Sequence, residues 1–321
     1  MKRSTKIGLI IAAALTAFGI VTVICSLMIL GFDPSALVTV EYETNSYDVE
    51  DEFKDISIVA NTEDIAFKHS EDGSCKVVVR EESRVKHTVT VENETLTIES
   101  DNQKKWYDNI GVGFESTSIT VYLPSDRAYG DLSIYVDTGD TEIADGFLFD
   151  SIDISADTGD ITNYAWTTGA MRFKVSTGYI TVKGAHADSI DLKSSTGNIT
   201  LEDVNCADEI THKCSTGKAL FENVNCNKFT SVGDTGDITL TAVNVTELLA
   251  VERDTGDVRF DGSDAAELVI ETSTGDVTGS LLSDKVFIIS TNTDDVNVPE
   301  SLSGGKCKIT TSTGDVELTV Q

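Results

Sequence analysis

Aspartates recur at one position of a repeated motif, directly after a turn glycine or the residue that replaces it. There are seven of them: Asp140, Asp160, Asp237, Asp257, Asp276, Asp295 and Asp315. If copies of the motif stack, neighbouring carboxylates repel one another, and a hard cation with oxygen ligands such as Ca²⁺ relieves that repulsion. Asp237, Asp257 and Asp276 stand in consecutive copies and are the best candidates for calcium ligands.

The same aspartates also have a structural explanation, which the sequence favours. Three consecutive copies lack the carboxylate and carry instead Tyr179, Asn198 and Lys218. The Gly-Gly-x-Gly-x-Asp repeat of calcium-binding β-rolls is absent from the chain. Because Asp, Ser and Thr beside a turn glycine commonly bond the local backbone, we expect a turn element and no resident cofactor, with calcium as the alternative.

Two cysteines and one aromatic segment are further candidates for chemistry. Cys206 and Cys226 each stand nine residues after a turn glycine, so stacking predicts that they approach disulfide distance. Two free, partly buried thiols are the alternative. Trp106, Tyr107 and Phe114 lie near two lysines in a segment that departs from the repeat. Such a loop either binds a sugar or a protein partner, or covers one end of the fold.

Catalytic motifs are not recognisable in the chain. The four histidines are scattered, and there is no HExxH, CxxC, Gly-x-Ser-x-Gly or phosphate-binding loop. His212 occupies an apolar position of the repeat, which favours a tolerated interior residue over a ligand. β-Helix polysaccharide lyases and hydrolases cluster carboxylates with a base on one face, whereas here the acids follow the repeat and Arg253 and Arg259 are the best bases. We expect no enzyme, with a surface carbohydrate-active enzyme as the alternative.

A repeat of 19 or 20 residues must position all these side chains. Its turn glycines, replaced once by Asp294, are Gly139, Gly159, Gly178, Gly197, Gly217, Gly236, Gly256, Gly275 and Gly314. Seven and five residues before the glycine, and two and four after it, 35 of 40 positions are apolar. This period of two is typical of a strand with one buried face. Two strands per copy and a looser third side predict an all-β, parallel β-helix-like β-solenoid, with glycine accepting positive φ at the turn.

The first 31 residues are a separate unit. Lys2, Arg3 and Lys6 precede an uncharged stretch from residue 7 to 31, which is long enough to span a bilayer. We expect an uncleaved signal anchor, with a cleaved signal peptide as the alternative. The basic residues lie before the span, so the N-terminus, residues 1–6, is expected in the cytoplasm. The protein is then a single-pass protein of the cell membrane with an extracytoplasmic solenoid.

The remaining chain divides by the regularity of its pattern. Residues 32–50 are expected to be a linker, 51–125 an irregular N-terminal part of the solenoid, and 126–321 the regular repeats. A degenerate turn at residues 61–64 follows the alternating Ile56, Ile58 and Ala60. The repeat continues to Val320 with no visible cap after it, so we expect this last coil to be outermost, either closed by the third side or with an open edge. A second copy of the chain could associate there.

The charge of the chain restricts its partners. It has 54 acidic and 24 basic residues, a net charge of −30, and without the first three basic residues the charge is −33 for residues 32–321. This argues against nucleic acid and against docking on anionic lipid. Acidity alone also keeps a repetitive β protein soluble. The expected partners are the membrane, through the N-terminal helix, and an envelope protein or polysaccharide.

The turn motif resembles that of a bacterial family of unknown function labelled as putative adhesin domains. The resemblance is carried by the Ser-Thr-Gly-Asp-Val turns at residues 273–277 and 312–316, and by Leu123-Pro124 before the regular repeats. It implies a membrane-anchored protein of the cell envelope, in some members linked to envelope stress, and brings no catalytic residues. We therefore expect a binding or scaffold module, with the enzyme and a calcium-dependent structural element as alternatives.

Overall fold

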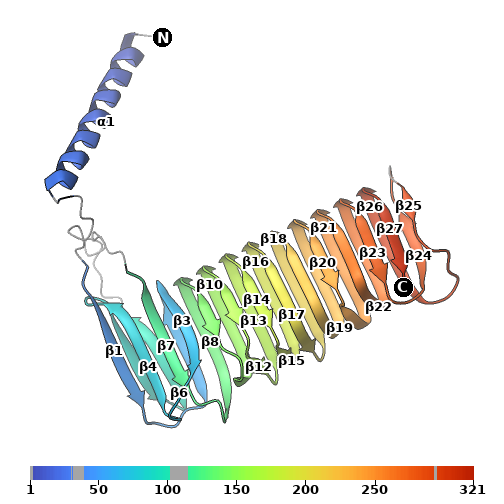
Figure 1. Cartoon of the computed structure of the whole chain (residues 1–321), viewed down its shortest axis with the longest axis horizontal. Helices are drawn as coiled ribbons and strands as arrows, with labels where there is room; N and C mark the ends of the chain where they lie inside the picture. Colours follow the sequence, from blue (N-terminus) through green and yellow to red (C-terminus); the bar gives the residue numbers. More distant parts are fainter. Residues whose placement is uncertain (1–2, 30, 32–39, 102–114, 293–294) are drawn as a thin grey trace. The chain divides into compact units, whose positions relative to one another are not determined.

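A computed structural model describes residues 3–29, 31, 40–101, 115–292 and 295–321 (Figure 1). The chain forms two compact units. One unit comprises residues 1–43, 82–85 and 102–115, and the other comprises residues 44–81, 86–101 and 116–321. The first unit contains the helix α1, Arg3–Ile29, and the second contains the β-solenoid.

Helix α1 is apolar after its first turn, which carries Arg3 and Lys6. The stretch Thr5–Ile29 has a mean hydropathy of 2.6, which is enough for a membrane span or a signal peptide. The hydroxyls of Thr16 and Thr22 donate to helix carbonyls, to Ala12 O at 2.9 Å and to Gly19 O at 2.7 Å. These two hydroxyls are thus satisfied within the helix, as a hydrocarbon environment would require.

The solenoid is the predicted all-β fold, and its coils are built from strands of two long sides and one short side. The strands that precede the turn glycine are β8 (Ala128–Thr138), β10 (Leu148–Thr158), β13 (Ala170–Thr177), β16 (Ser189–Thr196) and β18 (Glu209–Thr216). Those after it are β9 (Thr141–Ile143), β11 (Ile161–Asn163), β14 (Ile180–Lys183), β17 (Ile199–Cys206), β20 (Ile238–Thr241) and β23 (Val277–Leu281). The third side has β12 (Trp166–Thr167) and β15 (His186–Ala187). Four strands continue around corners: β17, β19 (Ala219–Thr235), β21 (Asn244–Thr255) and β22 (Val258–Thr274).

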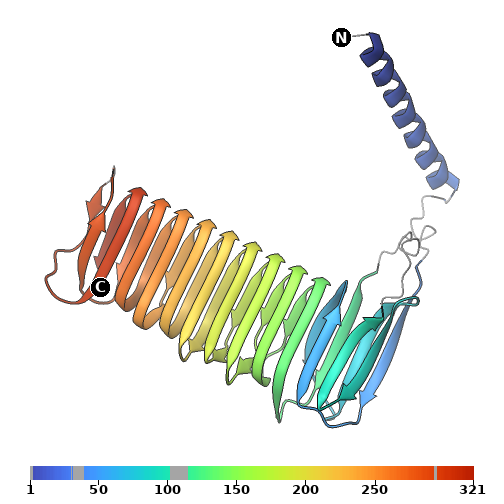
Figure 2. The ribbon, with the colours of Figure 1, turned by 180° about the vertical axis from the view of Figure 1, so that it is seen from behind.

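Successive coils pair in parallel and in register. The view from behind shows their strands stacked side by side (Figure 2). In one interior column Ile152 lies opposite Met171, Met171 opposite Ile190, and Ile190 opposite Ile210. Each of these side chains is buried. The repeat therefore becomes a continuous core in which every coil covers its neighbour.

The turn glycines are required for two reasons. All nine have a φ between 134° and 158°, which L side chains rarely adopt. A Cβ atom at any of them would also lie 1.8–2.3 Å from a carbonyl oxygen of the adjacent coil, which for Gly197 is Gly178 O. The glycine column is thus a backbone-to-backbone contact between coils as well as a turn.

At the N-terminal end the order of the coils in space differs from their order in the chain. The strands there are β1 (Tyr42–Val49), β2 (Asp55–Ala60), β3 (Glu63–His69), β4 (Cys75–Glu82), β5 (Lys86–Glu92), β6 (Thr95–Asp101) and β7 (Thr117–Leu123). Strand β2 pairs with both β6 and β8, and β3 with both β7 and β9, so the degenerate turn belongs to a stacked coil. Beyond them β4 pairs antiparallel with β7, and β5 pairs antiparallel with β6. Strand β1, which lies within the expected linker, pairs with β4.

The C-terminal end is interleaved in the same way. Its strands are β24 (Lys285–Ser290), β25 (Val296–Asn297), β26 (Gly305–Thr313) and β27 (Val316–Val320). Strand β26 lies between β22 and β24, and β27 lies between β23 and β25 (Figure 1). The expectation that the coil ending at Val320 is outermost is therefore wrong. Residues 282–284 connect β23 to β24 and leave one coil position between them. The last coil of the chain, β26 and β27, occupies that position.

Candidate functional site

The aspartates after the turn bond between coils and not within their own turn. Asp160 N–H donates to Asp140 Oδ1 at 2.8 Å, and Asp276 N–H donates to Asp257 Oδ1 at 3.0 Å. The same bond runs from Asp257 N–H to Asp237 Oδ1 at 3.3 Å. Each carboxylate thus satisfies a backbone N–H of the adjacent coil, which explains its recurrence without a ligand.

The calcium candidates share this arrangement. Asp237, Asp257 and Asp276 are each engaged through one oxygen in the backbone ladder. Among the residues that the structure describes, no three His, Cys, Asp or Glu side chains gather in a group that could hold a metal. A dedicated calcium site therefore stays a prediction with no geometric support beyond the column itself.

The cysteine pair lies in adjacent coils at the buried end of the third side. Asn205 and Asn225, which directly precede Cys206 and Cys226, are paired across strands β17 and β19. Both sulfurs are buried free thiols, and Cys206 Sγ donates to Asp188 O at 3.2 Å. Burial raises the pKa of Cys206 to about 11 and that of Cys226 to about 12. Both are therefore protonated and unreactive at neutral pH, and the disulfide stays a prediction.

The aromatic binding loop falls outside the described residues. Trp106, Tyr107 and Phe114 all belong to the segment 102–114. The nine turn glycines, by contrast, occupy their predicted turn positions. Asp294 also lies outside the described residues.

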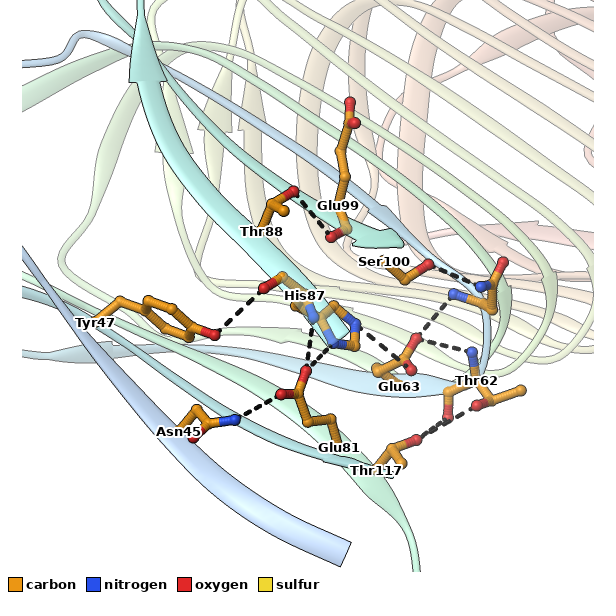
Figure 3. Close-up of polar contacts among 11 residues, drawn as sticks. Asn45, Tyr47, Thr62, Glu63, Glu81, His87, Thr88, Glu99, Ser100 and Thr117 are labelled. Atoms are coloured by element: carbon orange, nitrogen blue, oxygen red, sulfur yellow. Dashed lines mark hydrogen bonds and ion pairs between the residues drawn. The ribbon is translucent and has the colours of Figure 1, made fainter. Parts of the chain in front are cut away.

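A buried cluster of charged side chains lies at the N-terminal end of the solenoid (Figure 3). His87 Nδ1 is 2.7 Å from Glu81 Oε2, and the His87 backbone N–H donates to the same oxygen at 2.7 Å. On its other side His87 Nε2 lies 3.6 Å from Glu63 Oε1. All three residues are at most 4% exposed. An imidazolium between two carboxylates is the charge state that this geometry favours.

Backbone and amide donors complete the cluster, together with the Lys86 ammonium, whose Nζ lies 3.7 Å from Glu81 Oε1. Glu63 Oε2 accepts the N–H groups of Asn61 and Thr62 at 2.8 and 2.9 Å, and Asn45 Nδ2 donates to Glu81 Oε1 at 2.6 Å. Burial opposes ionisation, but the hydrogen bonds and charges of the partners outweigh it. The pKa of His87 is therefore raised and the pKa of Glu63 is lowered.

This cluster is a structural element and not an acid–base site. Its three ionisable groups are sealed from solvent, so no substrate atom can reach them. They join strand β5 to β3 and β4 and so hold the N-terminal coils together. Sequence reasoning missed the cluster because Glu81 and His87 stand in a region without the regular repeat. The one available signal was their alternation with apolar residues.

A groove of about 680 Å³ follows the third side of the solenoid over five coils. Its lining residues are almost all uncharged, and they are Thr167, Thr168, His186, Ala187, Asp188, Asn205, Cys206, Ala207, Asn225, Cys226, Asn227, Asn244 and Thr246. Asp188 is the single charged residue among them, although acidic residues outnumber basic ones by 54 to 24 in the chain.

Side-chain amides form a ladder along this groove. Asn225 Nδ2 donates to Asn205 Oδ1 at 3.1 Å, and Asn244 Nδ2 donates to Asn225 Oδ1 at 3.4 Å. Beside it Thr246 Oγ1 donates to Asn227 Oδ1 at 2.7 Å. The ladder fixes the amides at one interval per coil, about 4.8 Å, and leaves a row of donors and acceptors facing solvent.

An exposed indole stands at one end of the ladder. Trp166 is 47% exposed, and its Nε1 donates to Gly184 O at 2.6 Å. Its ring meets the His186 ring edge-on, with the centroids 4.4 Å apart. The hydrogen bond fixes the orientation of the indole, so its apolar surface is presented without a further entropic cost. Trp166, the amide ladder and His87 were not identified from the sequence.

These features define a class of protein: a β-solenoid with an N-terminal apolar helix and a polar groove across its coils. The family model described as Toastrack DUF4097 matches residues 53–212 and 205–321. The chain therefore belongs to the Toastrack DUF4097 family. No curated protein matches the sequence.

Solved structures share the fold at low sequence identity. One is described as a putative lipid binding protein from Parabacteroides distasonis, with 16% identity, a TM-score of 0.52, and coverage of 75% of this chain and 98% of that chain. Another is described as a putative adhesin from Parabacteroides merdae, with 12% identity, a TM-score of 0.50, and coverage of 76% and 97%. At these identities the likeness concerns the fold alone.

Proposed function

We propose that this protein is a membrane-anchored, extracytoplasmic adhesin-like module that binds a neutral polysaccharide of the cell envelope without catalysis. The observation that carries the proposal is the uncharged groove of the third side, with its amide ladder and oriented indole. Amides exchange hydrogen bonds with sugar hydroxyls, and an aromatic face packs against the apolar face of a pyranose ring.

The repeat geometry favours a polymer over a single sugar. The groove presents the same amide at Asn205, Asn225 and Asn244, one coil apart. A ligand that repeats along the solenoid axis can contact each coil in the same way. Several weak contacts then add to a useful affinity.

The proposed absence of catalysis rests on the charge of the groove. Glycoside hydrolysis requires a pair of carboxyl groups across the scissile bond. Asp188 is the single carboxylate among the groove residues. The solved Parabacteroides merdae structure described as a putative adhesin supports a binding role.

The proposed anchor and topology rest on α1 and its flanking charges. Lys2, Arg3 and Lys6 all precede the apolar stretch, and the next charged residue is Asp33. By the positive-inside rule the solenoid is extracytoplasmic. Protease added to intact cells should digest the solenoid, and digestion only after lysis would contradict this topology.

The binding proposal is tested with the full chain in lipid nanodiscs and a panel of neutral oligosaccharides. Trp166→Ala should weaken binding of a recognised oligosaccharide at least about tenfold, since aromatic anchors contribute about 2 kcal/mol or more. Tyr179→Ala is the matched control, because Tyr179 is 52% exposed but directly follows the turn glycine Gly178 and so lies off the third side, whereas Trp166 directly precedes the groove residue Thr167. Equal affinities for the two variants, or no binding of any neutral glycan, would overturn the proposal.

A further inference from the structure

Three consecutive coils reverse the acidic pattern of the solenoid. One outward-facing column runs through Ser155, Lys174, Lys193, Lys213 and Val232, which are paired strand to strand. The column two residues further along changes in the same coils. It reads Asp137, Asp157, Ser176, Ser195, Ser215, Asp234 and Asp254, and serine returns at Ser273 and Ser312, where the aspartate after the turn is kept. Each of the three consecutive coils therefore gains a lysine and exchanges an aspartate for a serine.

The aspartate after the turn is missing from the same three coils, where Tyr179, Asn198 and Lys218 replace it. Both acidic columns are thus interrupted in the three coils in which the lysines stack. Turn geometry does not demand this, because the glycines and their φ angles continue unchanged through Gly178, Gly197 and Gly217.

The lysine stack is electrostatically unfavourable in the isolated protein. Like charges directly opposite on neighbouring strands, about 4.8 Å apart, destabilise a sheet. Lys193 is paired with Asp191 at 2.5 Å. Lys174 and Lys213 have no ion-pair partner among the described residues, although the chain carries 54 acidic side chains. Apart from Asp191, the sequence removes neighbouring acids from this face instead of supplying them.

A groove of about 300 Å³ lies along the stack. Its lining includes the three lysines together with Ser194, Ser195 and Ser215. Hydroxyl and ammonium donors therefore converge on one channel that crosses three coils. Asp234 is the single acidic residue in the lining, at the end of the channel.

A buried guanidinium lies behind the same groove. Arg253 is 3% exposed and pairs in register with Gly233, whose backbone lines the groove. A Cβ on Gly233 would lie 2.4 Å from Arg253 Nη1, so the guanidinium occupies the space of the missing side chain. Its guanidinium donates to two uncharged acceptors, the backbone carbonyl of Glu252 at 3.1 Å and Ser231 Oγ at 2.8 Å. No carboxylate among the described residues neutralises it.

We propose that this cationic groove, defined by Lys174, Lys193, Lys213, Ser195 and Ser215, binds a linear phosphate-bearing polymer that runs along the solenoid axis. Lysines placed one coil apart match a chain of closely spaced anions better than one isolated anion. Serine hydroxyls supply the additional donors that phosphate oxygens accept. The surface is separate from the amide-ladder groove, so this proposal does not depend on the neutral-glycan proposal.

Binding of short-chain polyphosphate to the full chain in neutral-lipid nanodiscs tests the proposal. The double variant Lys174→Gln, Lys213→Gln should bind polyphosphate at least about tenfold more weakly, with a smaller salt dependence. The matched control is Lys306→Gln, Lys308→Gln, which changes the net charge equally at lysines already paired with Glu267 and Glu271. Ser195→Asp, which restores the acidic column, should also abolish binding.

Two further arms separate the sources of phosphate and the structural role. Orthophosphate at equal phosphorus concentration should not compete, and phosphatidylglycerol vesicles should not bind better than neutral ones. The double variant should be at least as stable as the wild type without polymer, because it relieves repulsion. Equal polyphosphate affinity in the double variant and its control would overturn the proposal. Competition by orthophosphate, or binding to the anionic vesicles, would do the same.

Discussion

At the scale of the residue, single side chains here act mainly between coils. The turn aspartate satisfies a backbone N–H of its neighbour, as in the 2.8 Å bond from Asp160 N to Asp140 Oδ1. The turn glycine allows the adjacent carbonyl to approach. The sequence alone places both residues in the turn, but it does not show that their partners belong to another coil. The repeat motif is therefore a rule for stacking as well as for turning.

The buried His87 cluster predicts a dependence of stability on pH. The pKa of His87 is raised in the folded state. Its contribution to the free energy of unfolding is therefore complete below the unfolded-state pKa of about 6.5 and is lost as pH rises through the folded-state pKa. Because the pKa of Glu63 is lowered, its contribution is lost only as pH falls through that lowered value. We expect the strands β5 and β6 to lose protection from hydrogen exchange as pH rises from about 6.5.

The matched variant for this prediction is His87→Gln. It removes the cation between two buried carboxylates and should cost about 3 kcal/mol of unfolding free energy at neutral pH. It should also abolish the alkaline loss of protection in β5 and β6, after correction for intrinsic exchange rates. A wild-type profile that stays flat on the alkaline side would show that His87 is not charged in the folded state.

At the scale of the element, the strand pattern was largely predictable and the order of the strands was not. The period of two around each glycine predicts which residues of β13, β16 and β18 face the core, and the structure confirms this. That pattern does not predict the position of β26 between β22 and β24. Coils of equal length and equal apolar pattern stack equally well in either order, so other contacts must select it.

A buried ion pair provides such a contact. Lys285 of β24 is 2% exposed, and its Nζ lies 2.5 Å from Asp264 Oδ1 of β22 and 2.7 Å from Ser283 Oγ. Its strand partner is Gly305 of the intervening β26, which has no side chain to block the path. The outermost coil is thus tied to the coil two positions away, across the inserted one.

Lys285→Met should therefore destabilise the C-terminal coils strongly. Leaving Asp264 unpaired in a mostly buried site should lower the free energy of unfolding by about 3 kcal/mol. Denaturant unfolding measures this loss, and proteolysis of the connection 298–304 reports on the C-terminal coils. Lys306→Met is the control, because its pair with Glu267 is half-exposed and contributes less than about 1 kcal/mol. Similar losses for the two variants would mean that the ion pair does not select the order of the coils.

At the scale of the whole molecule, the charge of −30 gives the calcium alternative a direct test. The aspartate column already has partners in the backbone N–H groups of adjacent coils. We therefore expect the full chain to have the same thermal unfolding midpoint in millimolar CaCl₂ and in an equal concentration of MgCl₂, since both salts only screen charge. A rise specific to calcium would restore a dedicated site at Asp237, Asp257 and Asp276.

Function was less predictable than fold for a physical reason. Trp166 and the asparagine ladder lie on the third side, where the apolar pattern is weakest and the sequence gives little register information. Self-association at an open end stays a prediction, and its site moves to β24, where Val286 and Ile288 are exposed. The departures from the repeat, not the repeat itself, point to both proposed grooves.

The interleaved ends also restrict how this solenoid can change its length during evolution. A coil gained by duplication after β27 or before β2 would have no free position, because both of those coils already lie between two others. Repeats can be added or lost only between β8 and β23, where order in the chain and order in space coincide. Relatives of different length should therefore keep both end modules and differ in the number of middle coils.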